Sequence, residues 1–116
     1  MYNYLEVDSE NLEYVTVAGL DELGNGERLI VDIDGEPIAV FNIAGHFYAI
    51  ADVCSHDDGP VAEGDISEYE IACPRHGAKF DIRNGQVLTL PAIVDIPAYP
   101  VRIEGNEIQI GLPAES

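Results

Sequence analysis

Hydrophobic residues alternate with other residues along much of the chain, at a period of two positions. In residues 28–34, Leu29, Val31 and Ile33 take every second position, and "PIAVFNI" begins two positions after Asp34-Gly35. A period of two is typical of a β-strand whose two faces have different surroundings. Because Asp-Gly is a frequent two-residue hairpin turn, we predict two antiparallel strands joined at Asp34-Gly35.

Further turn signals divide the rest of the chain into short strands. Ala44-Gly45 precedes "HFYAI", Asn84-Gly85 separates "KFDI" from "QVL", and Glu104-Gly105-Asn106 separates "VRI" from "IQI". Glycine and asparagine are the usual residues of such turns, because they accept a positive φ. We therefore predict a hairpin at each of these three places.

The pattern as a whole predicts an all-β, antiparallel sandwich or barrel. The last hairpin is expected to pair Val101 and Ile103 with Ile108 and Ile110. No window of twelve or more residues has a helical period, and only residues 19–25 could form one short helical turn. Six to nine short strands are expected. Residues 1–116 contain no repeat, low-complexity tract or linker, so they are interpreted as a single domain.

The charge of the chain excludes several functions. The formal net charge is −17, with only five lysines and arginines among 116 residues. Nucleic acids and anionic membrane surfaces are therefore not expected partners, since both are bound through basic residues. The acidic surface either keeps the protein soluble or steers it toward a basic partner. No apolar stretch has the length of a signal peptide or a membrane span, so a cytoplasmic location is expected.

Two cysteine-histidine pairs are the candidate site. Cys54 and His56 are followed, after sixteen intervening residues, by Cys73 and His76. Each pair comes directly after a predicted strand and is followed closely by glycine. Two thiolates and two imidazoles suit either a tetrahedral zinc ion or a Rieske 2Fe-2S cluster. Four unrelated residues are the third interpretation, and Cys-x-His is tight spacing for zinc.

The motifs "CSH" and "CPRHG" resemble the signature of the Rieske family, most closely that of the small Rieske ferredoxins of multicomponent oxygenases. The likeness covers roughly residues 26–111. It implies an antiparallel β-sandwich with two cluster-binding loops at one tip and one 2Fe-2S cluster per chain. By the same resemblance, Cys54 and Cys73 would bind the buried iron and His56 and His76 the exposed one. His46 lies outside both motifs and is expected to have no metal role.

The chain departs from the respiratory members of the family at four positions. Gly59 and Arg75 replace two cysteines that form a disulfide between the loops there, so no such disulfide can form. Ala78 and Phe80 replace a serine and a tyrosine that donate hydrogen bonds to the cluster. Because donors to a cluster sulfur stabilise its reduced state, we expect a low reduction potential, about −150 mV on the scale of Rieske centres.

The resemblance implies an electron carrier that is not itself an enzyme. Four protein ligands leave the iron no open position, and no other motif of the chain predicts catalysis. The implied partners are a flavin-dependent ferredoxin reductase and a terminal aromatic-ring oxygenase. Asp57, Asp58 and Asp81 are interpreted as solvated surface charges. The alternatives are a Rieske-like small subunit of a nitrite reductase and a zinc-stabilised binding module, which would be colourless.

Overall fold

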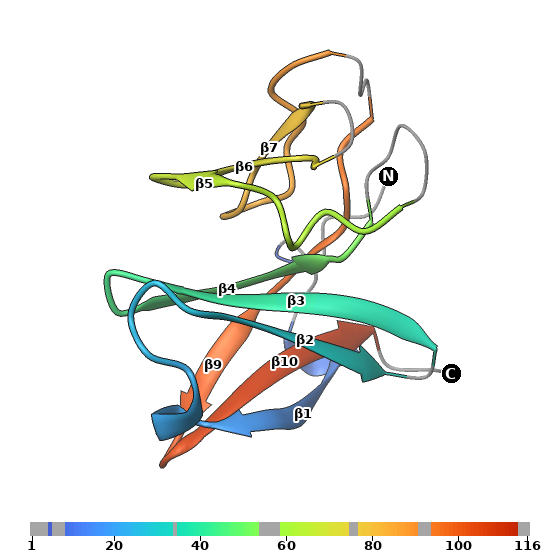
Figure 1. The fold of residues 1–116 in the computed structure, drawn as a ribbon. Helices are drawn as coiled ribbons and strands as arrows, with labels where there is room; N and C mark the ends of the chain where they lie inside the picture. The colour runs from blue at the N-terminus through green and yellow to red at the C-terminus, as the bar shows by residue number, and fades with distance from the viewer. Residues whose placement is uncertain are drawn as a thin grey trace.

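Ten β-strands in three antiparallel sheets make up the described part of the chain (Figure 1). The structure is a computed structural model, and it describes residues 5, 9–33, 35–53, 59–74, 77–90 and 94–113. The first sheet has the order β1-β10-β9, from Leu12–Gly19, Glu107–Pro113 and Val101–Glu104. The second has the order β2-β3-β4-β8, from Arg28–Ile33, Glu36–Ile43, His46–Ala51 and Ala98–Tyr99. The third has the order β5-β6-β7, from Ile66–Ser67, Glu70–Ala72 and Lys79–Asp81.

The all-β prediction is confirmed. The helices among the described residues are short 3-10 segments, including η2 (Ser9–Asn11) and η3 (Leu20–Glu22). The η3 segment is the single helical turn expected within residues 19–25. No helix in the described ranges is long and apolar enough to cross a membrane. The strand count exceeds the predicted six to nine, because β5 and β8 are two residues long and show no alternation.

Two-residue turns form the predicted hairpins of the second sheet. Ile33 pairs with Glu36 around the turn that contains Gly35, whose φ is +84°. The β3–β4 turn has positive φ at both Ala44 (55°) and Gly45 (85°), as a type I′ turn requires. These turns match the right-handed twist of the strands, so the sequence signals were sufficient to locate them.

The other two predicted hairpins are confirmed with small changes. Val101 and Ile103 pair with Ile110 and Ile108 as expected, but Glu104 also pairs, so the β9–β10 turn has only two residues. After β7, the chain returns antiparallel to it through hydrogen bonds and one isolated bridge instead of a full strand.

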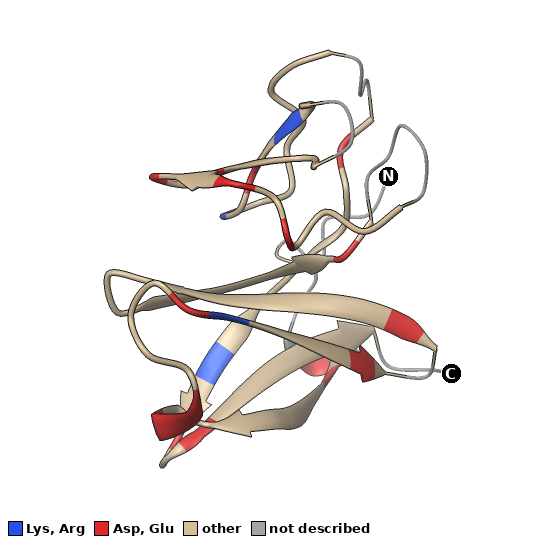
Figure 2. Ribbon diagram, in the orientation of Figure 1, with Lys and Arg blue, Asp and Glu red and all other residues tan. Residues whose placement is uncertain are grey.

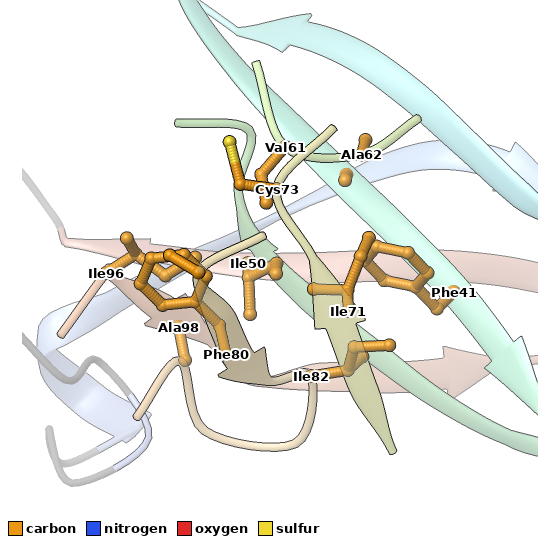
Figure 3. Close-up of a cluster of buried hydrophobic side chains, with 12 residues drawn as sticks. Phe41, Ile50, Val61, Ala62, Ile71, Cys73, Phe80, Ile82, Ile96 and Ala98 are labelled. Carbon is orange, nitrogen blue, oxygen red and sulfur yellow. The ribbon is translucent and has the colours of Figure 1, made fainter. Parts of the chain in front are cut away.

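The second sheet lies between two hydrophobic cores. Along β3, Ala39 and Phe41 face one core while Ile38 and Val40 face the other, so the strand is buried on both sides. The core toward the first sheet also contains Ala18, Leu23, Ala49, Ala51, Tyr99, Ile108 and Ile110. The core toward the third sheet also contains Ile50, Val61, Ala62, Ile71, Cys73, Ala78, Phe80, Ile82, Ile96 and Ala98 (Figure 3).

The N-terminal part of the chain belongs to this fold. Strand β1 pairs along its length with β10, from Leu12 opposite Pro113 to Gly19 opposite Glu107, with an irregularity between Thr16 and Ala18. The resemblance seen in the sequence left residues 1–25 without a role. Within that segment, residues Leu12–Gly19 form β1, an outer strand of the first sheet.

Candidate metal centre

Cys73 begins a tight turn directly after β6. Its thiol side chain is buried, with only 2% of the residue exposed. The Cys73 N–H donates to the Ala78 carbonyl at 2.7 Å, and the Gly77 N–H donates to the Cys73 carbonyl at 2.9 Å. Gly77 has a φ of +78°, in the left-handed region that glycine adopts without strain. These two bonds fix the backbone at Cys73, Gly77 and Ala78.

The other three predicted ligands, Cys54, His56 and His76, lie outside the described residues. Within the described ranges, no group of three or more His, Cys, Asp or Glu side chains could hold a metal ion. His46 is exposed at the first position of β4, directly after the Ala44-Gly45 turn. The structure therefore locates one predicted ligand and the segments that flank the others.

The segments that flank the two loops lie against each other. Asp52, just after β4, is 7% exposed, and its Oδ1 accepts hydrogen bonds from the N–H groups of Val61 (2.8 Å) and Ala62 (2.7 Å). These bonds close the loop of residues 53–60 at its base. Gly64 then touches the residue before Cys73, since a Cβ on Gly64 would lie 1.6 Å from the Ala72 carbonyl oxygen.

Apolar side chains surround Cys73 on the inner side. In Figure 3 its sulfur lies at one end of the buried cluster, beside Val61. Ala78 and Phe80, at the two positions where a hydroxyl was expected to be missing, are fully buried in the same cluster. Apolar side chains exclude water and lower the local dielectric constant, which strengthens electrostatic interactions with a group bound beside them. A buried thiol in a glycine-containing turn, followed in sequence by a histidine, fits the ligand chemistry of a 2Fe-2S centre.

The outer side of the Cys73 turn is open. A hollow of about 410 Å³ lies there, lined by Glu63, Gly64, Asp65, Ala72, Cys73, Pro74 and Gly77. The turn is therefore covered by core on one side and reachable from solvent on the other.

The expectation that Asp81 is a solvated surface charge is wrong. Asp81 is 7% exposed, and Arg83 donates to both of its oxygens from Nε (3.1 Å) and Nη2 (2.9 Å). Burial pushes the pKa of Asp81 upward, but the hydrogen bonds and charge of Arg83 outweigh it and leave the pKa below 3.8. Arg83 also lies 4.5 Å from the centre of the Tyr69 ring. The Asp81–Arg83 pair therefore holds the last residue of β7 to the turn that follows it. Asp57 and Asp58 lie outside the described residues.

Acidic side chains occur on all three sheets, whereas basic ones are few (Figure 2). Among the described basic residues, each of the three arginines has an identified partner. Arg83 pairs with Asp81, Arg28 donates to backbone carbonyls, and Arg102 lies 4.0 Å from the centre of the Tyr14 ring. The described surface therefore presents little positive charge to a partner.

The fold and the cysteine turn define a class of protein. Three antiparallel sheets, the smallest of which ends in a buried cysteine turn, are an iron-sulfur scaffold of the Rieske type. Residues 13–100 match the family of the Rieske [2Fe-2S] domain. The chain belongs to that family, and the match begins within β1, earlier than the resemblance noted in the sequence.

Several proteins that resemble the chain are ferredoxins. The chain is 41% identical over 93 residues to the 3-phenylpropionate/cinnamic acid dioxygenase ferredoxin subunit of Escherichia coli strain K12, covering 79% of this chain and 87% of that protein. The ferredoxin of carbazole 1,9a-dioxygenase from Nocardioides aromaticivorans IC177 has a TM-score of 0.78 at 35% identity, covering 84% of this chain and 95% of that one. A chain from a complex of reduced oxygenase and oxidized ferredoxin in carbazole 1,9a-dioxygenase also has a TM-score of 0.78, at 26% identity, covering 84% and 91%. The resemblance to small Rieske ferredoxins is thereby confirmed.

Proposed function

We propose that this chain is a one-electron carrier that holds one 2Fe-2S cluster on Cys54, His56, Cys73 and His76. It would receive electrons from a flavin-dependent ferredoxin reductase and deliver them to a terminal aromatic-ring oxygenase. The observation that carries the proposal is the buried Cys73 thiol, in a closed turn at the end of β6, within the segment that matches the Rieske family.

The residues of the chain would bind and shield the redox centre. When bound, a 2Fe-2S cluster supplies a site that gains and loses a single electron. The core around Cys73 excludes water from one side, and the open hollow leaves the other side accessible to a partner. Four protein ligands leave no open position for substrate, so the chain would carry electrons without catalysing a reaction of its own.

A terminal oxygenase is the proposed acceptor. The relatives are ferredoxins of dioxygenase systems, and one solved neighbour comes from a complex with its oxygenase. The segment after β7 bonds to Lys79 and presents three large apolar side chains, Leu88, Leu90 and Val94; Leu90 is 76% exposed. Exposed apolar side chains favour docking to another protein. The acidic net charge favours a partner with a basic surface. A cytoplasmic location is part of the same proposal.

Spectroscopy of the purified protein tests the proposal. The protein is expected to be red-brown, silent in electron paramagnetic resonance when oxidised, and to give a rhombic signal of low average g after dithionite reduction. Potentiometry is expected to give a midpoint of about −150 mV, low among Rieske centres. A colourless protein that contains one zinc ion per chain would contradict the proposal and support a structural module instead.

Adding hydroxyl groups at Ala78 and Phe80 is expected to raise the potential. A hydrogen bond to a charged group contributes about 1.5 kcal/mol or more, and 1.5 kcal/mol corresponds for one electron to about 65 mV upward for each donor that reaches the cluster. Potentiometry of Ala78→Ser and Phe80→Tyr measures the shift. Ile82→Val, in the same core without a new hydroxyl, is the control and should leave the potential unchanged. A lowered potential in both hydroxyl variants would refute the explanation.

A further inference from the structure

The turn formed by residues Val61 to Gly64, the Val61–Gly64 turn, is held by two charged side chains from opposite sides. The Gly64 N–H donates to the Val61 carbonyl at 3.0 Å and closes the turn. On its N–H side, Asp52 accepts from Val61 and Ala62. On its carbonyl side, Arg28 Nη1 donates to Ala62 at 2.6 Å and to Gly64 at 2.7 Å. Asp52 thus binds the N–H groups of the Val61–Gly64 turn, and Arg28 binds its carbonyl groups.

The Val61–Gly64 turn lies between the flanks of the two predicted ligand loops. Asp52 comes two positions before Cys54 in the sequence, and its bonds hold Val61 and Ala62, which follow the first predicted ligand pair, against the residue that precedes it. On the other side, Gly64 is packed against the Ala72 carbonyl, and the Ala72 N–H donates to the Asp65 carbonyl at 3.0 Å. Ala72 directly precedes Cys73. The Val61–Gly64 turn thus contacts both the residue that lies two positions before Cys54 and the residue directly before Cys73.

No covalent link can replace this contact. The chain has two cysteines, and both are predicted ligands, so no disulfide can join the loops. Hydrogen bonds in which one partner is charged are roughly twice as strong as neutral ones. We propose that Arg28 and Asp52 are positioning residues for the iron-sulfur site, which hold the Val61–Gly64 turn and thereby fix the spacing of the two loops. This inference rests on the proposed function, because it concerns retention of the same cluster.

Loss of the cluster from the reconstituted full-length protein tests the inference. The visible circular dichroism of Arg28→Met and Asp52→Ala, followed in the presence of a chelator, is expected to decay about tenfold faster than that of the original protein. Asp52→Asn keeps an oxygen acceptor at the same place and should recover part of the loss. The g-values of the reduced Arg28→Met and Asp52→Ala proteins are also expected to shift or broaden, because the loop spacing is no longer fixed.

Two remote variants serve as matched controls. Asp32→Ala removes an aspartate that accepts the Gly35 N–H in the β2–β3 turn, and Arg102→Met removes an arginine bonded to Gln109 on the first sheet. Both should lose the cluster within about a factor of two of the original rate. Thermal unfolding of every variant separates cluster loss from general instability. If Asp52→Ala does not fold, Asp52→Asn and Arg28→Met carry the test.

The outcomes distinguish this inference from the proposed function. An original protein without a Rieske spectrum would overturn the proposed function and the inference with it. An original protein with that spectrum, whose Arg28 and Asp52 variants retain the cluster as long as the two controls, would overturn the inference alone.

Discussion

The Cys73→Ala protein is expected to fold but to contain no iron after anaerobic reconstitution. Alanine keeps the backbone bonds of the turn, from the Cys73 N–H to Ala78 and from Gly77 to the Cys73 carbonyl, since neither involves the thiol. What disappears is the thiolate, and a buried methyl group offers iron no ligand. Iron analysis and the visible spectrum should therefore fall from a full 2Fe-2S complement to the baseline. The loss should be complete, because the chain has no spare cysteine.

Two variants control for damage to the fold. Ile71→Val removes one methylene from a fully buried residue of β6 and should cost about 1 kcal/mol while the iron content stays unchanged. His46→Ala removes an exposed imidazole outside both motifs and should also leave the iron in place. A Cys73→Ala protein that kept its full iron content would exclude Cys73 as a ligand. A His46→Ala protein that lost its iron would show that the proposed set of ligands is wrong.

Gly64→Ala is expected to destabilise the fold strongly. The new Cβ would lie 1.6 Å from the Ala72 carbonyl oxygen and 2.8 Å from its carbonyl carbon, and both are backbone atoms. Relief requires that β6 or the Val61–Gly64 turn move, and overpacking of this kind costs about 3 kcal/mol or more. For a chain of this size, the thermal midpoint should fall by about 12 °C or more.

Gly19→Ala is the matched control for this effect. Gly19 has an ordinary extended conformation, with φ −80° and ψ 153°. The atoms nearest to its added Cβ would be the ends of the Asp21 and Glu22 side chains, at 3.0 Å or more, so relief would cost at most the exposed hydrogen bond from the Gly19 N–H to Glu22. Circular dichroism melts should therefore place Gly19→Ala close to the original protein and Gly64→Ala far below it. Equal melting temperatures would show that the close approach of Gly64 to Ala72 does not constrain the fold.

Local signals in the sequence were enough to predict the hairpins, whereas distant pairings were not. The turns at Gly35 and Gly45 depend on residues that are adjacent in the chain, so composition alone reveals them. The pairing of β1 with β10 joins the two ends of the domain, and no local pattern encodes which strands meet across that distance. The role of β1 was missed for this reason.

The residues around the candidate site also differ in whether the local sequence predicts their role. Cys73 could be found because its motif is compact and chemically unusual. Asp52 and Arg28 could not, because their partners lie up to 36 positions away in the chain. Asp81 was misjudged because an aspartate between apolar residues shows neither its burial nor its bond to Arg83. An aspartate directly after an apolar strand, as Asp52 follows β4, was the one available signal.

The third sheet and the segments that accompany it come from one continuous stretch of chain, between the end of β4 at Ala51 and the start of β8 at Ala98. Its main contact with the rest of the protein is the face of the second sheet that presents Ala39, Phe41 and Ile50. The segment that carries the four predicted ligands is thus inserted into a β-sandwich whose other strands pair without it. Substitutions within this segment can therefore change the surroundings of the predicted ligands while the strand pairing of the first two sheets stays the same.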